Sequence, residues 1–138
     1  MNQQKTQQML AQELAFGPHL MLDLQKCDPN TLSDQSLVYD ILCNLPTKVG
    51  MTKMTLPYVC KWMDKFGTKE GISGFVMIAE SHISIHTFPD QDYVFIDLFS
   101  CRGFDIEKAI TMLKNAFGAQ VMHQNLVMRG PGFDRGAA

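Results

Sequence analysis

The sequence predicts an α+β domain built as a two-layer sandwich, in which helices pack on one face of an antiparallel or mixed sheet. The predicted elements follow the order strand, helix, strands, helix, strand, and no repeat or linker divides them. The 138 residues are the length of one domain, and a hydrophobic content of 46% is ordinary for a globular protein. We expect a single domain over residues 17–129, a helical arm over residues 1–16 and a flexible tail over residues 130–138.

The first predicted elements are a strand and a helix. Residues 19–24 form a short apolar segment that predicts a strand. A helix is expected to begin near Thr31 or Ser33, either of which can cap it, and to end at Pro46, because proline breaks a helix interior. Its buried face is predicted from apolar residues that recur at a spacing of three and four, namely Leu37, Val38, Ile41, Leu42 and Leu45.

The middle of the chain is predicted to be mostly extended. Residues 49–60 are irregular, and Pro57 places part of this segment at a sheet edge, since proline cannot donate to a strand ladder. Residues 64–70 are typical of a loop. The continuous apolar run at residues 75–79 predicts a strand that is buried on both faces.

A hairpin and a final helix–strand pair complete the domain. Residues 81–87 and 93–99 are expected to pair as a hairpin across a turn at residues 88–92. An amphipathic helix follows that Asp105 can cap and Gly118 can end; its apolar residues are Ile106, Ala109, Ile110, Leu113, Ala116 and Phe117. Residues 120–128 predict the last strand.

Composition argues against several classes of partner. The formal net charge is −2 and no basic block stands out, so nucleic acid is not an expected partner. No apolar run approaches the roughly 18 residues of a membrane span. The four cysteines (Cys27, Cys43, Cys60 and Cys101) have no zinc-type spacing, and the N-terminus has no apolar signal core. We therefore expect a cytoplasmic protein with free thiols.

Three polar features could carry chemistry. His82 and His86 lie four residues apart on one predicted strand, but no third ligand has suitable spacing, so no metal site is predicted. Cys101 follows a strand beside a glycine, where it is either a small core residue or a reachable thiol. Ser73 is, from its immediate sequence, a turn residue.

The motif Glu80-Ser81-His82, followed by His86-Thr87 and then by Asp97-Leu98-Phe99-Ser100-Cys101, resembles the prokaryotic S-adenosylmethionine decarboxylases. These are self-processing enzymes that depend on a pyruvoyl group. The resemblance runs from about residue 17 to residue 129, so the arm and the tail are not covered. It implies a pyruvoyl decarboxylase domain over residues 17–129.

The resemblance also implies a role for each motif residue. The chain would cut itself between Glu80 and Ser81, and Ser81 would become the pyruvoyl group that forms a Schiff base with the substrate amine. His86 would accept a proton during processing, Ser73 would assist it, and Cys101 would donate a proton to the substrate after decarboxylation. Such a group supplies the electron sink that no ordinary side chain provides.

The implied substrate-binding residues leave the substrate open. By resemblance they are Phe66, Ile83, Phe88 and Asp90. The family usually has tryptophan where this chain has Phe88, and glutamate where it has Asp90. A smaller ring stacks less surface on a purine, and Asp90 or Asp92 could instead bind a guanidinium or ammonium group.

Three hypotheses therefore stand. The leading one is a decarboxylase of S-adenosylmethionine that supplies the aminopropyl donor for polyamine, and specifically spermidine, synthesis. The second keeps the mechanism but takes L-arginine or L-ornithine. The third is an unprocessed relative with a structural or regulatory role. The resemblance further implies a dimer or larger assembly of processed units, with the active site near a subunit boundary and Phe66 serving the neighbouring subunit.

One feature of the spacing disagrees with the implied roles. Residues 81 and 86 are an odd number apart, so a regular strand places their side chains on opposite faces. Either the chain bends beside the cleavage point or the strand starts elsewhere.

Overall fold

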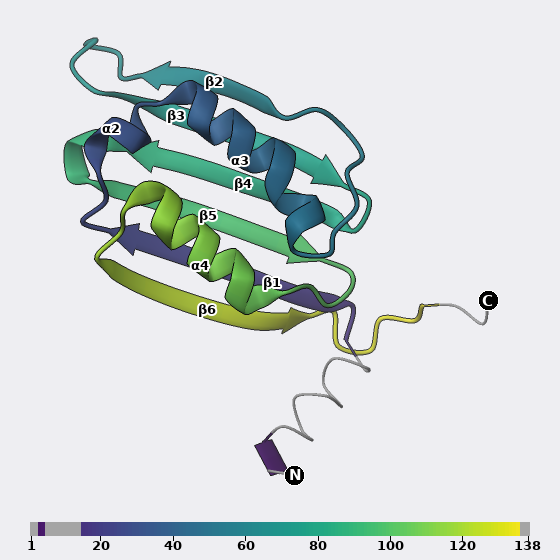
Figure 1. Ribbon diagram of the computed structural model, residues 1–138. Coiled ribbons are helices and arrows are strands. Elements are labelled where there is room, and N and C mark those ends of the chain that lie inside the picture. The colour runs from purple at the N-terminus through teal and green to yellow at the C-terminus, as the bar shows by residue number, and fades with distance from the viewer. Residues whose placement is uncertain (1–2, 5–14, 136–138) are drawn as a thin grey trace.

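Six strands form one sheet in the computed structural model of the chain, which describes residues 3–4 and 15–135 (Figure 1). The predicted arm at residues 1–16 falls mostly outside the described residues. The elements are β1 (Gly17–Gln25), α2 (Pro29–Leu32), α3 (Gln35–Lys48), β2 (Tyr58–Met63), β3 (Glu70–Ile78), β4 (Ser81–Phe88), the 3₁₀ turn η1 (Pro89–Gln91), β5 (Tyr93–Ser100), α4 (Ile106–Phe117) and β6 (Val121–Arg129).

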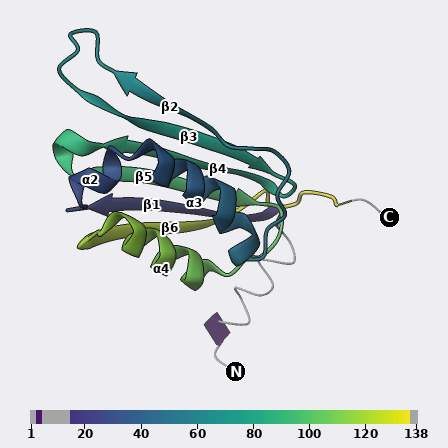
Figure 2. The same cartoon turned by 45° about the horizontal axis from the view of Figure 1, so that its top comes forward.

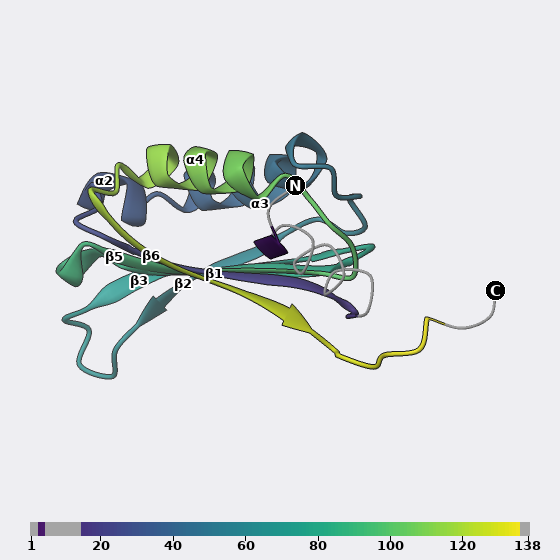
Figure 3. The same cartoon turned by 90° about the horizontal axis from the view of Figure 1, so that it is seen from below.

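The sheet has the order β2-β3-β4-β5-β1-β6, and every neighbouring pair is antiparallel. Helices α2, α3 and α4 all cover the same face, and the opposite face has no helix on it among the described residues (Figures 2 and 3). The predicted two-layer α+β sandwich is confirmed. The predicted hairpin is also confirmed, because β4 and β5 pair across η1.

Strict alternation along the strands builds the core between the sheet and the helices. In β4, Ile83 and Ile85 are fully buried, while the side chains on either side of them are more exposed. The neighbouring strands and the helices add fully buried residues of the same kind, among them Leu20, Leu22, Leu42, Ile72, Ile96, Leu98, Leu113 and Phe117. The other residues of each strand point to the opposite face of the sheet, which we call the open face.

Helix α4 has the ends that the sequence predicts. Asp105 caps it by accepting a hydrogen bond from the Lys108 N–H, and Gly118 ends it in the left-handed conformation at φ 61°. The expected caps of the first helix were wrong. Asp28 caps the short α2 and Asp34 caps α3, because each carboxylate accepts a backbone N–H of the first turn.

The expected end of the first helix at Pro46 was also wrong. Helix α3 continues to Lys48, with the proline ring buried inside the last turn. The Pro46 carbonyl still accepts hydrogen bonds from the N–H groups of Val49 and Met51. Proline removes a donor and keeps its acceptor, so the last turn closes despite it.

Strand β3 is longer than predicted and is buried on one face only. Phe75 is 42% exposed and Met77 is 45% exposed, which overturns the prediction of a strand covered on both sides. On the covered face, a Cβ atom added to Gly74 would lie 2.6 Å from the Leu42 side chain. The glycine therefore lets α3 approach the sheet closely.

The expected edge position of residues after Pro57 is confirmed, since β2 is the first strand of the sheet. At the other end of the chain, residues 130–135 return toward the start of β1. Phe133 packs edge-on against Phe16 at 4.7 Å between ring centroids, and Arg135 donates to the Cys101 carbonyl at 2.6 Å. No helix in the described part of the chain is long and apolar enough to cross a membrane.

Candidate active site

The predicted cleavage bond lies in the tight turn between β3 and β4, at the end of the sheet where β5 finishes. Ser81 opens β4 and is paired with Ser100, the last residue of β5. The backbone N–H of Cys101 donates to the Glu80 carbonyl oxygen at 2.9 Å. Predicted residues Glu80, Ser81 and Cys101 are therefore brought together by β-sheet pairing. We call Glu80, Ser81, Ser100, Cys101 and Arg102 the cleavage end.

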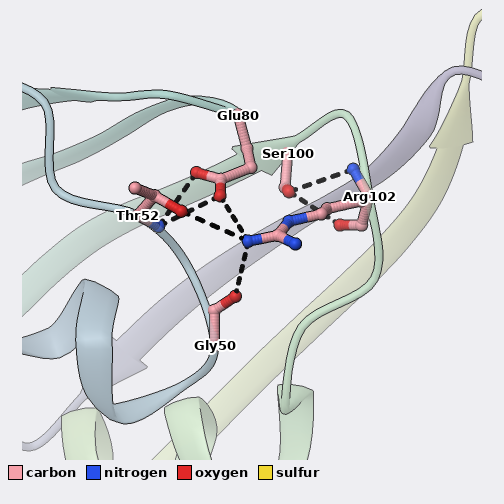
Figure 4. A network of polar contacts seen from close by, with 5 residues as sticks. All are labelled: Gly50, Thr52, Glu80, Ser100 and Arg102. Carbon is pink, nitrogen blue, oxygen red and sulfur yellow. Dashed lines mark hydrogen bonds and ion pairs between the residues drawn. The ribbon is translucent and has the colours of Figure 1, made fainter.

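The Glu80 side chain is buried, and both of its carboxylate oxygens accept hydrogen bonds (Figure 4). Its two carboxylate oxygens each accept the Thr52 backbone N–H at 3.0 Å, and Arg102 Nη2 binds Oε1 at 2.7 Å. Burial alone would raise the pKa of Glu80, but the hydrogen bonds from Thr52 and Arg102 hold it below its ordinary value. The residue before the predicted cleavage bond is an ionised carboxylate.

The other predicted processing residues lie together on the open face. Ser73 and His86 are direct partners in the β3–β4 register, and Ser73 Oγ lies 3.0 Å from His86 Nδ1. They line a shallow pocket of about 140 Å³ together with Tyr58, Cys60 and Ser84 among others. A hydrogen bond to one ring nitrogen orients the imidazole and leaves the other nitrogen available for a proton.

An aromatic group continues this face toward the β4–β5 turn. Phe88 packs on Trp62 at 5.3 Å between ring centroids and on the edge of Phe95 at 5.7 Å. Asp90 lies beside these rings in η1 and pairs with Lys69 at 3.5 Å. We call Ser73, His86, Phe88 and Asp90 the histidine end.

Trp62 is a residue of this group that the sequence reasoning did not single out. A Cβ atom on Gly71 would lie 2.6 Å from the Trp62 ring, so the indole lies directly over that glycine. The alternation of β2 could have indicated it, since Trp62 is two residues beyond Cys60 and shares its face. The indole packs against Phe88.

The remaining predicted substrate residues fall elsewhere. Phe66 is 75% exposed in the loop between β2 and β3, with Lys65 Nζ 5.0 Å from the centre of its ring. Ile83 is fully buried in the core beneath the helices, so its side chain does not reach the open face.

The two ends lie far apart in one chain. Strand β4 is regular from Ser81 to Phe88, and five residues of strand span roughly 16 Å. His86 lies on the open face beside Ser73, whereas residue 81 has the parity of the buried Ile83. The disagreement noted in the spacing is therefore real, and no bend at the start of β4 removes it.

Between the two ends, His82 lies on the open face among aromatic rings. It stacks on Phe75 at 5.5 Å and meets the edge of Phe99 at 5.6 Å. Burial lowers the pKa of His82, and His19 and Arg129 lower it further, while Asp97 acts in the opposite direction. No group of three or more histidine, cysteine or acidic residues suited to a metal occurs among the residues described.

Comparisons with known proteins bear on the fold and on the family of the chain. The structure is similar to that of the adenosylmethionine decarboxylase from Aquifex aeolicus, with a TM-score of 0.71 at 20% identity over 90% of this chain and 98% of that one. That likeness supports the fold.

Two curated relatives are named S-adenosylmethionine decarboxylase proenzyme. One, from Pyrococcus horikoshii, is 33% identical over 83% of this chain and 79% of its own length. The other, from Acidithiobacillus ferrooxidans, is 32% identical over 84% of both chains. The family model described as S-adenosylmethionine decarboxylase matches residues 18–130. The chain belongs to the S-adenosylmethionine decarboxylase family.

Proposed function

We propose that the chain cuts itself between Glu80 and Ser81 to become a pyruvoyl-dependent decarboxylase of S-adenosylmethionine. Its product would donate aminopropyl groups to polyamine synthesis. The observation that carries the proposal is the hydrogen bond from the Cys101 N–H to the Glu80 carbonyl oxygen at 2.9 Å. A donor at this oxygen stabilises the negative charge that develops when a nucleophile attacks the carbonyl carbon.

Self-cleavage needs a nucleophile, an oxyanion donor and a base. The Ser81 hydroxyl bonds to the Glu80 carbonyl carbon, the amide C–N bond breaks, and the nitrogen takes the hydroxyl proton, which leaves an ester. His86 then removes the Cα proton of residue 81, and the bond between Cβ and Oγ of residue 81 breaks, which forms the Cα=Cβ double bond of dehydroalanine and releases Glu80 as a carboxylate. Water hydrolyses the resulting dehydroalanine, releasing ammonia and leaving the pyruvoyl group.

The residues around Ser81 fit such a group, because residue 81 begins a strand and its neighbours fix the backbone on both sides. When formed, the pyruvoyl group supplies an electron sink for decarboxylation. Cys101 follows Ser100, the strand partner of residue 81, at the same end of the sheet and is half-buried, a position from which its thiol can donate a proton to the substrate carbon. Phe88 and Asp90 bind the nucleoside part by stacking and by hydrogen bonding to a hydroxyl.

We further propose that two chains assemble through the open face. His86 cannot reach residue 81 of its own chain, since the strand holds them roughly 16 Å apart. The open face also exposes the large apolar side chains of Phe75, Met77 and Phe95, and exposed apolar groups of this kind are typical of surfaces that bind another protein. With a two-fold axis across this face, the histidine end of one copy would lie near the cleavage end of the other. The cytoplasmic location expected from the sequence stays a prediction.

Two measurements test the proposed function. Intact mass after expression should show two chains, residues 1–80 and 81–138, the second without a free amine at its N-terminus. Carbon dioxide release should then occur with S-adenosylmethionine and not with L-arginine or L-ornithine. A stable single chain would contradict the enzyme, and release from arginine or ornithine alone would contradict the substrate.

A further inference from the structure

Burying the Glu80 carboxylate is energetically costly, and the side chain makes contacts that offset this cost. A carboxylate with 5% of its side chain exposed loses most of its hydration, which is unfavourable unless the charge is paired and hydrogen-bonded. Here Thr52 and Arg102 provide that compensation (Figure 4). Arg102 Nη2 is itself placed by the Gly50 carbonyl at 3.2 Å and by Thr52 Oγ1 at 3.3 Å. We call Thr52, Glu80 and Arg102 the Glu80 clamp.

The backbone around the clamp is fixed as well. The Ala79 N–H donates to the Thr52 carbonyl at 3.0 Å, so the segment after α3 holds the turn on the side before the cleavage bond. On the other side, the turn after β5 carries both the Cys101 N–H and the Arg102 guanidinium. The fully buried Ser100 holds that turn, because its Oγ donates to the Arg102 carbonyl at 2.7 Å and accepts the Arg102 N–H at 3.2 Å.

These contacts converge on one peptide group. The Glu80 carbonyl oxygen is bound by Cys101 and the Glu80 carboxylate by Arg102, the next residue in the chain. A shift of the Glu80 side chain therefore moves the carbonyl relative to its donor. Reactions that depend on the orientation of a nucleophile and an acceptor lose on the order of 10²-fold in rate for a displacement of about 1 Å.

We propose that Arg102 is a positioning residue for self-cleavage, which through the Glu80 carboxylate holds the Glu80 carbonyl on the Cys101 N–H for attack by Ser81. This inference rests on the proposed function. After cleavage, Glu80 ends the first chain and Arg102 belongs to the second, so the same ion pair joins the two products.

The test follows the cleavage of newly made chain in a cell-free translation pulse and compares first-order rates. Arg102→Ala should slow cleavage on the order of 10²-fold, and Glu80→Gln should slow it less, because a neutral amide keeps the shape of the side chain. Added methylguanidinium should partly restore the rate of Arg102→Ala, since the Arg102 side chain is 56% exposed and its place is open to a small cation.

The matched control is Lys61→Ala, which breaks an exposed ion pair between Lys61 on β2 and Glu70 on β3 at 3.7 Å. It should cleave at the wild-type rate. Stability is measured separately with Ser81→Ala alone and combined with Arg102→Ala, because neither can cleave. If Arg102→Ala unfolds the chain, the cleavage rates of Arg102→Lys and Glu80→Gln test the inference in its place.

The outcomes separate the inference from the proposed function. If the wild-type chain does not cleave, the proposed function fails first. If it cleaves and the folded Arg102 and Glu80 variants cleave within twofold of it, the inference alone is overturned. Slower cleavage without rescue by methylguanidinium or by Arg102→Lys would assign the pair to folding rather than to positioning.

Discussion

The two ends of β4 differ in how completely one chain builds them. At the cleavage end, the carbonyl that must be attacked already has its donor, and the Glu80 side chain is held by residues from two other segments. At the histidine end, Ser73 and His86 face outward from an uncovered sheet. The comparison shows that one chain holds the bond in place at one end and leaves the imidazole uncovered at the other, which is the basis for proposing that the base comes from a second copy.

Removing the Ser81 hydroxyl is expected to have the largest effect, because it takes the nucleophile from the cleavage end. Ser81→Ala should give a single chain by intact mass, with decarboxylase activity at background and an unchanged circular dichroism spectrum. Ser36→Ala, on an exposed position of α3, should still give two chains. If Ser81→Ala still gave two chains, Ser81 would not be the nucleophile, and the cleavage end would not have the role proposed for it.

Mixing two defective chains tests whether the ends of different copies meet. His86→Ala alone should slow cleavage by about 10²–10⁴-fold, the usual contribution of a positioned base. Co-expression with Ser81→Ala should restore cleavage of the His86→Ala chain, since the partner then supplies the imidazole. Mass spectrometry distinguishes the two chains.

The control for that mixture is a double variant, Ser81→Ala with His86→Ala, which lacks the imidazole at position 86 and should give no rescue. Equal cleavage with both partners would place the whole reaction within one chain. It would also contradict the two-fold arrangement proposed for the open face.

A smaller effect is expected from the aromatic group, and it should separate binding from processing. Phe88→Ala removes the ring that packs on Trp62 and should raise KM for S-adenosylmethionine roughly tenfold through lost stacking. The cleavage rate should change much less, because Phe88 supplies neither the nucleophile, the base nor the oxyanion donor of self-cleavage. Leu56→Ala, at a position 77% exposed, should change neither quantity. A matching loss in cleavage rate would join the two functions at one end.

The smallest effect is the pH dependence of stability that His82 adds between the two ends. Its pKa in the folded protein is lowered, chiefly by burial, so below about pH 6.5 the unfolded chain binds more protons than the folded one. The contribution of His82 to the free energy of unfolding should therefore be fully present above about pH 6.5. The free energy of unfolding should fall as the pH drops below this value. Urea midpoints over this window measure the effect, and His82→Gln should flatten it. A rise in stability on acidification would reverse the assignment.

Much of this arrangement could be predicted from local patterns. The alternation of β4 places residues 81 and 86 on opposite faces, and the structure keeps that regularity. The spacing and ends of α4 predicted that helix, because a cap acid and a glycine act within one turn of it. Resemblance to the family was enough to assign roles to the motif residues. The distance between residue 81 and His86 followed only from the regular strand in the structure.

What could not be predicted depends on contacts between distant residues. Nothing near Arg102 in the sequence indicates that its guanidinium lies against Glu80 and Gly50, since β5 and the segment after α3 meet only in the fold. The exposure of Phe75 and Met77 was missed because an apolar run looks the same whether helices or a second molecule cover it. Pro46 was misjudged because its carbonyl still serves the helix.

The position of Trp62 makes it a natural optical reporter. It is the chain's single tryptophan, half-buried over Gly71 and against Phe88. A purine that stacks on Phe88 would change the surroundings of the indole and so its emission. Substrate titrations can therefore follow intrinsic fluorescence, without a label, in the uncleaved Ser81→Ala chain as well as in the processed protein. Binding can in this way be observed apart from catalysis.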